Sequence, residues 1–433
     1  MAIQSNVVET NMPTGDHLVS VKNRGWPVAF AGMGINLALG VLYSWSVLSK
    51  KIPTEWNWSE ADRAWPYAVA CLVFSLIMVP AGRMQDKVGP RAVASLGGVM
   101  VGVGMIIASF TTSPLGFIVG FGLLAGIGIG CGYASATPPA VKWFPAAKTG
   151  MVAGIVVSGF GLASVYAAPL SAKLIALYGL QTTMMVLGIG FFLLVVGLAQ
   201  VLQPPPKGYV PAGTVPAASG AAAKKEDFTP AEMLKTWQFY VLWFMYACGA
   251  GAGLMIISKL AKMVDVQAGV QLGFVLVAVL SVGNGAGRII AGILSDKIGR
   301  KATLFICFAM QSVFILLLSY AKKDNVLGGA GVLAVLSALI GANYGANLAL
   351  FPSVTKDFYG LKNFGVNYGF VFTAWGLGGF MLSLLAGWVY DGKLVADWKG
   401  SFAFAYYCSA ALLVAAAIIT FLVKSPQQKQ AAA

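Results

Sequence analysis

The sequence predicts an all-α membrane protein with twelve transmembrane helices in two pseudo-symmetric six-helix bundles. Of its 433 residues, 58% are hydrophobic and 10% are charged, and the mean hydropathy is +0.78. An ordinary soluble domain carries roughly 25% charged residues. The apolar runs are continuous, whereas a transmembrane barrel would show alternating segments of about ten residues. A loop motif that occurs twice divides the chain into halves.

Each run long enough to cross about 30 Å of hydrocarbon, roughly 20 residues, predicts one helix. In chain order the predicted helices lie near 27–49, 62–83, 92–112, 115–140, 150–174, 181–202, 237–259, 268–294, 302–321, 326–350, 365–389 and 401–424. The first run is too extended for a typical cleaved signal peptide, so we expect it to stay as a membrane anchor.

The repeated motif is GRMQDKVGPR after the second helix and GILSDKIGRK after the eighth, 210 residues apart. The spacing predicts an N-terminal bundle at 27–202 and a C-terminal bundle at 237–424. Between them, 203–236 contains PPP and a KKED cluster and is expected to be a flexible linker. With the tails 1–26 and 425–433, it is expected on the cytoplasmic side.

The motif predicts a tight helix–loop–helix connection in each half. Its first glycines are expected to allow close helix approach, its later glycines to permit the turn, and its aspartates to cap or pair locally. We expect its basic residues to face the cytoplasm. The gating residues are Gly82, Asp86, Gly89 and Arg91 in the first copy, and Gly292, Asp296, Gly299 and Arg300 in the second.

The net charge of +14 does not indicate nucleic acid, because the basic residues lie in loops beside a lipid bilayer. With both termini on one side, about 18 of the 29 basic residues fall there, which marks that side as cytoplasmic. The five cysteines show no metal or disulfide spacing, and the single histidine, His17, lies in the tail. GIGIGCGY, which ends at Tyr133, is expected to be a helix-packing face, so no cofactor is predicted.

Arg288 is the strongest candidate for a functional residue. It lies deep in an apolar run, where a guanidinium keeps its charge and costs several kcal/mol unless it is paired. Asn284 is one helical turn away, and Gly283, Gly285 and Gly287 are expected to open room beside it. Together the two side chains could bind a carboxylate.

Arg288 could instead bond only backbone carbonyls or join helices. Against this, every Asp and Glu maps to a tail, a loop or a span end, and no second membrane cation is predicted. Asp265, expected just past the seventh helix, and Asp391, at the end of the eleventh, are proton-coupling candidates or ordinary loop charges. Further candidate substrate contacts are Tyr43, Tyr133, Asn343, Tyr344, Asn347, Phe372 and Trp375.

The repeated motif resembles that of the major facilitator superfamily. This resemblance implies two bundles that rock around a central site, with the motif latching the outward-open state. VLYSWSV, KWFPAAKTGMVAGIVVSGFG, LKTWQFYVLW and LALFPSVTKDFYGLKNFGVNYGF resemble the bacterial oxalate/formate antiporter family, which is related to the animal monocarboxylate porters. This resemblance implies small carboxylates as substrates and assigns Arg288 as their partner.

Two departures refine the expected substrate and coupling. The oxalate carrier has a lysine where this chain has Trp375, so one fixed cation predicts a monocarboxylate such as lactate, pyruvate, glycolate or formate. The animal porters have an aspartate where this chain has Asn284, so the residue that carries a coupled proton stays unassigned. Binding is expected to neutralise Arg288 and to lower the barrier to closure.

The function predicted from the sequence is therefore monocarboxylate transport, most simply with a proton, across the bacterial cytoplasmic membrane by a monomer. An oxalate/formate-type exchanger and a carboxylate sensor that does not transport remain alternatives. No catalytic carboxylate pair, nucleophile–base set or metal cluster can be recognised in the sequence, so an enzyme is not predicted.

Overall fold

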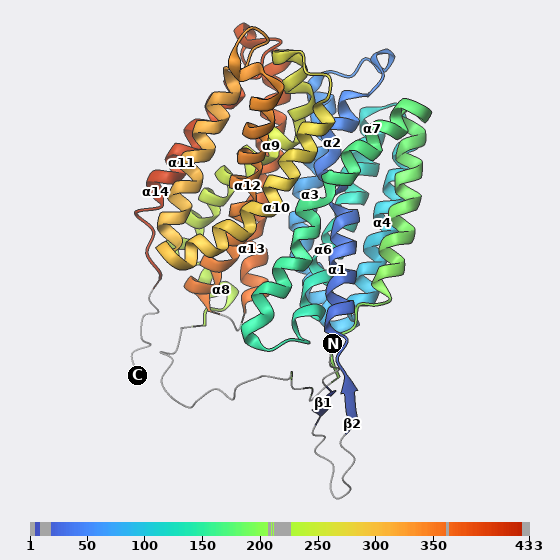
Figure 1. Cartoon of the computed structure of the whole chain (residues 1–433), viewed down its shortest axis with the longest axis vertical. Helices are drawn as coiled ribbons and strands as arrows, with labels where there is room; N and C mark the ends of the chain where they lie inside the picture. The colour runs from blue at the N-terminus through green and yellow to red at the C-terminus, as the bar shows by residue number, and fades with distance from the viewer. Residues whose placement is uncertain are drawn as a thin grey trace, which may run out of the picture.

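The computed structural model describes residues 5–8, 19–206, 209, 211, 227–360 and 363–426. His17, most of the linker, and most of the two tails lie outside the described residues. Ahead of the first helix, β1 (Ser5–Val8) and β2 (Val19–Lys22) form a short antiparallel ribbon that the sequence did not predict. The rest of the described chain is dominated by long α-helices (Figure 1).

The described residues contain ten stretches long and apolar enough to cross a membrane. One of them lies in α7 (Ala146–Ala199), which leaves helical geometry at Gly179 (φ 77°, ψ 171°) and so comprises two helical segments. A further helix, α14 (Ala403–Ile419), is apolar but only 17 residues long. Twelve apolar helical segments result, as the sequence predicted.

The first half begins with α1 (Gly25–Leu39), which a 3₁₀ turn at Gly40–Ser44 joins to α2 (Trp45–Lys50). It continues with α3 (Glu60–Val88), α4 (Pro90–Ser109), α5 (Pro114–Phe117), a π-helical stretch at Ile118–Leu124, α6 (Ala125–Val141) and α7. The second half holds α8 (Pro230–Met233), α9 (Trp237–Ala268), α10 (Gly273–Ile298), α11 (Arg300–Ser319), α12 (Ala330–Tyr359), α13 (Phe364–Tyr390) and α14. Short 3₁₀ turns lie at Thr54–Trp56, Val326–Gly328 and Ala396–Trp398.

Helices pack mainly within each half, and the most extensive packing between the halves involves two helix pairs. α4 and α1 pack on α7 in the first half, whereas α10 packs on α12 and α9 on α13 in the second. Across the interface, α3 packs on α13 and α7 on α10. α1 begins and α14 ends at the same end of the molecule, which we call the near end; the opposite one is the far end (Figure 1).

Contacts between the halves are present at the centre and are lost toward the near end. A Cβ at Gly161 of α7 would lie 3.2 Å from the Arg288 guanidinium, but one at Gly154, seven residues nearer the near end, would meet nothing within 4 Å. Likewise Gly285 of α10 faces Leu162, whereas Gly292 faces open space. Positions seven residues apart lie on nearly the same helix face, so α7 and α10 separate toward the near end.

α3 and α13 separate in the same direction. Gly376 of α13 lies against Ser75, and Gly369 lies against Val79, but Gly365 and Gly82 have open space around them. The expectation that Gly82 and Gly292 bring helices together is therefore wrong for this conformation, because both lie beyond the point where the helices separate.

The repeated motif forms two matching turns. Gly89, between α3 and α4, has φ 93° and ψ 154°, and Gly299, between α10 and α11, has φ 90° and ψ 157°. Only glycine adopts this conformation readily, which confirms why the sequence repeats a glycine there.

Candidate functional site

Arg288 lies near the middle of α10, on the face that meets α7 of the other half. Its side chain is buried, with 9% of the residue exposed, and Asn284 is fully buried one turn away. Arg288 Nε donates to Asn284 Oδ1 at 3.2 Å, and Nη1 donates to the Val157 carbonyl at 2.9 Å. The arginine therefore joins the two halves through a backbone carbonyl. This contact agrees in part with the alternative that Arg288 only bonds carbonyls or joins helices.

These contacts leave donors unpaired. Within the described part of the chain, Arg288 Nη2 and Asn284 Nδ2 are buried and have no hydrogen-bond partner. A buried unpaired donor costs about 1–3 kcal/mol, and more when it is charged. No described carboxylate forms an ion pair with Arg288. The pair thus keeps the unpaired donors and the positive charge that a carboxylate ligand needs.

The backbone of α7 forms the surface under the guanidinium. Gly161 packs against Cζ, Nη2 and Nε of Arg288. Ser281, two turns before Arg288, donates to the Gly161 carbonyl at 2.5 Å. The sequence did not single out Gly161, which is one of several glycines in its run.

Gly283 and Gly287 do not open room beside Arg288. A Cβ at either position would lie 2.0 Å from a backbone carbonyl of α12, that of Ala338 or Ala342. The expected role of these two glycines is therefore wrong: they allow α10 and α12 to pack closely.

Aromatic rings from both halves surround the site. Tyr133 of α6 interacts electrostatically with Arg288. Its ring centroid lies 5.4 Å from that of Phe160 and 5.3 Å from that of Phe74. Phe372 of α13 stacks on Tyr133 at 6.3 Å. The sequence predicted Tyr133 and Phe372, but Phe74 and Phe160 carry no polar group that would have distinguished them from core residues.

A hydrogen-bonded chain of three aromatic residues crosses the interface. Trp375 Nε1 donates to the Tyr344 hydroxyl at 2.8 Å, and that hydroxyl lies 2.6 Å from the Tyr43 hydroxyl. Tyr43 also interacts electrostatically with Arg288. All three residues are buried, so the structure brings them together where the two halves are in contact.

The side-chain amides of the two asparagines of α12 donate to backbone carbonyls of their own helix. Asn343 Nδ2 donates to the Leu339 carbonyl, and Asn347 Nδ2 donates to the Asn343 carbonyl, one turn back in each case. Asn347 lies against Gly249 of α9, inside the second half.

The two acidic candidates make contacts between the halves. Asp265 lies in the last turn of α9, not beyond the helix as expected, and its carboxylate is 3.0 Å from Lys50 Nζ. Asp391 Oδ1 and Oδ2 accept from the backbone amides of Glu60 and Ala61, each at 2.9 Å. A carboxylate at a helix N-terminus is favoured by the helix dipole.

A second buried cation, Lys259, corrects the expectation that Arg288 is alone. Lys259 is 1% exposed, because α9 continues nine residues past the predicted end of the seventh helix. Its Nζ lies 3.0 Å from Glu60 Oε2 and donates to the Glu60 carbonyl at 2.8 Å. Glu60 is the first residue of α3 and is 8% exposed.

The hydrogen bonds and ion pairs of the gating-motif residues lie within their own halves. Arg300 pairs with Asp296 at 2.7 Å and with Asp357 at 3.2 Å. Arg91 donates to Gln203 Oε1 at 2.8 Å. The described residues therefore show no latch between the halves at the near end, as expected where the helices separate.

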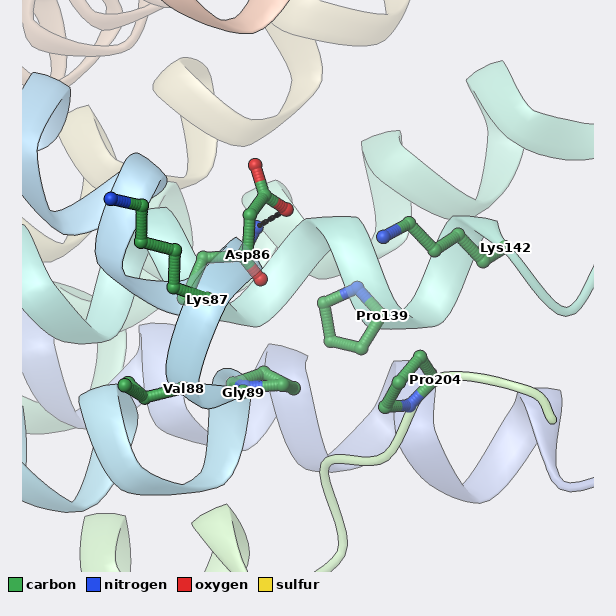
Figure 2. Close-up of a pocket in the computed structure, with 9 residues that line it drawn as sticks. Asp86, Lys87, Val88, Gly89, Pro139, Lys142 and Pro204 are labelled. Atoms are coloured by element: carbon green, nitrogen blue, oxygen red, sulfur yellow. Dashed lines mark hydrogen bonds between the residues drawn. The ribbon is translucent and has the colours of Figure 1, made fainter. Parts of the chain in front are cut away.

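A surface pocket of about 330 Å³ lies beside the first copy of the motif, at the near end. Asp86, which accepts from Gln85 Nε2 at 2.6 Å, borders it, and Lys142 extends over Pro139 toward it (Figure 2). It is lined by residues 85–90, Pro139, Lys142 and Pro204, none of which contributes to the Arg288 site.

Two bundles of transmembrane helices joined around a buried arginine define a membrane transporter architecture. The family model of the Major Facilitator Superfamily matches residues 28–280 and 265–433, so the chain belongs to that superfamily. The structure is similar to that of a bacterial homologue of the human lysosomal transporter Spinster, in an inward-facing and unoccupied conformation. The TM-score is 0.67 at 16% identity, covering 93% of this chain and 97% of that one.

Proteins of similar sequence include transporters that are named for small carboxylates. The oxalate:formate antiporter of Oxalobacter formigenes is 28% identical, over 84% of each chain. Mouse monocarboxylate transporter 11 is 28% identical over 38% of this chain and 37% of its own length. The resemblance stated from the sequence is confirmed, and the protein is a multi-pass membrane protein of a transporter family.

Proposed function

We propose that the protein moves a small monocarboxylate, together with a proton, across the bacterial cytoplasmic membrane by alternating access. The observation that carries this proposal is the buried pair Arg288 and Asn284, each with an unpaired donor at the interface of the halves. An arginine fork and an amide one turn apart match the oxygens of one carboxylate. The aromatic rings around the pair suit a short carbon chain.

The conformation supports alternating access. The halves meet at the far end and at the centre, and they separate toward the near end. We assign the near end to the cytoplasm, since both termini and the basic loops are expected there. The protein is then in an inward-open form, in which Arg288 is held by Val157 of the opposite half.

The central test is the variant Arg288→Gln in proteoliposomes. Radiolabelled lactate uptake should fall to the level of protein-free vesicles, because glutamine cannot provide the charge or the fork. Lys173→Gln, which removes an equal charge from an exposed position on α7, should leave uptake unchanged. Uptake by the Arg288 variant at the rate of the unmodified protein would refute the carboxylate clamp.

The same vesicles distinguish symport from exchange. With a proton symporter, an imposed pH gradient drives lactate accumulation; competition by pyruvate, glycolate, formate and oxalate then ranks the substrates. The similarity to an oxalate:formate antiporter makes anion exchange the second candidate. Counterflow that requires internal formate and does not respond to pH would favour exchange over symport.

A further inference from the structure

Three carboxylates join the halves at the far end, outside the Arg288 site. Glu60 of α3 pairs with Lys259 of α9, and Asp391 of α13 accepts from the first two amides of α3. Asp265 of α9 pairs with Lys50 of α2. Each contact crosses between the halves, and each is strongest when the carboxylate is ionised. We call Glu60, Asp265 and Asp391 the far-end carboxylates.

Glu60 is the most enclosed of the three. Its carboxylate lies 3.0 Å from Lys259 Nζ and 3.5 Å from Arg63 Nε. Side-chain exposure is 10% for Glu60 and 2% for Lys259, against 24% for Asp265. The titratable and charged groups around Glu60 are Lys259 and Lys262 from α9, Arg63 and Asp62 from α3, and Asp391 and Tyr390 from α13.

We propose that Glu60 is a proton-binding site through which acid at the far end opens that end of the transporter. In the closed far end, the ionised carboxylate neutralises a cation that has no access to water. Opening must separate α3 from α9, which gives the carboxylate water in place of Lys259. A proton therefore binds more readily to the open form than to the closed one.

Linkage then sets the direction of the effect. A ligand shifts an equilibrium toward the state that binds it more tightly, so lower pH favours the open far end. A proton on Glu60 in the closed form would leave Lys259 buried with a backbone carbonyl but no counter-ion, which is strongly unfavourable. Asp265 should contribute less, since its more exposed pair with Lys50 is weakened by solvent.

The inference rests on the proposed alternating access, but its test needs no substrate. Spin labels at Thr54 and Leu394, both exposed far-end positions in different halves, report the distance between the halves in the full chain in nanodiscs. Cys408, which is only partly buried, is replaced by serine beforehand. A wrong substrate assignment would leave this measurement unaffected, so the two proposals can fail separately.

Between pH 8 and pH 5, we expect the ratio of long-distance to short-distance populations to rise about tenfold in the unmodified protein. Glu60→Gln should already show the raised ratio at pH 8 and should lose most of the response to pH. Glu55→Gln, which removes the same charge from an exposed position at the far end, should behave like the unmodified protein.

Lys259→Gln provides a second test if the Glu60 variant does not fold. It removes the cation that pairs with Glu60 from the other half and leaves Arg63 of its own helix, so the far end should open more at pH 8 and respond to pH several-fold less. The proposal is overturned if a folded variant of either residue keeps both the distances and the pH response of the unmodified protein. It is also overturned if the unmodified protein shows no change between pH 8 and pH 5.

Discussion

Gly161→Ala is the sharpest test of how α7 positions the carboxylate-binding arginine. An added Cβ would lie 3.2 Å from Cζ and Nη2 of Arg288 and 3.3 Å from Nε. The guanidinium must then move by a few tenths of an ångström. Its bonds to the Val157 carbonyl and to Asn284 Oδ1 oppose that movement.

The magnitude follows from the cost of overpacking. Adding a methyl group to a packed site costs about 1–3 kcal/mol. Because the guanidinium is the flexible end of its side chain, we expect the lower part of that range. A loss of about 1–2 kcal/mol in carboxylate binding corresponds to a rise of about 5- to 30-fold in KM. The maximal rate should change much less, because Arg288 keeps its charge.

The assay is the initial rate of lactate uptake into proteoliposomes at a series of concentrations. Gly154→Ala is the matched control, since it lies on the same face of α7 with nothing within 4 Å. Both changes increase helix propensity by about 1 kcal/mol, so a general effect on α7 appears in both variants. Equal KM values for the two variants would refute the positioning role of Gly161.

Three further predictions concern selectivity and stability. Trp375→Lys should increase inhibition of lactate uptake by oxalate, because a second cation compensates a dianion; an unchanged ratio of inhibition constants would contradict the charge argument. Gly299→Ala should lower the unfolding free energy by about 1–3 kcal/mol, as its φ of 90° strains any side chain, whereas Gly292→Ala should not; thermal unfolding compares the two. Tyr344→Phe should destabilise more than Tyr43→Phe, by about 1 kcal/mol, since it also leaves Trp375 Nε1 unpaired; equal melting temperatures would contradict this.

The membrane-spanning helices could be predicted because hydrocarbon requires continuous apolar runs, which are a local property of the sequence. The pairing of Arg288 with Asn284 could also be predicted, since one helical turn separates them. The same holds for Gly89 and Gly299, where a repeated motif identifies a glycine-specific turn. In each case, the information lies within a few residues or in a direct comparison of two segments.

The contacts between the halves could not be predicted in this way. The apolar run predicts a helix that ends at Lys259, which is the first charged residue after Trp237. Its partner, Glu60, lies 199 residues earlier, and no local pattern connects them. Gly161 presents the same difficulty. It lies seven residues from Gly154 on the same face of α7, and only the position of α10 distinguishes the two glycines.

Lys259 is a second buried cation, but the charge balance at the interface still favours the proposed substrate with a single carboxylate. Lys259 is neutralised by Glu60 at 3.0 Å, so it adds no net charge to the closed interface. Among the described residues, the partners of Arg288 are an amide oxygen, a carbonyl oxygen and the Tyr133 side chain, and none of them is a carboxylate. One uncompensated positive charge therefore remains at the centre. A monocarboxylate would neutralise it, whereas a dianion would bury one unpaired negative charge beside Trp375.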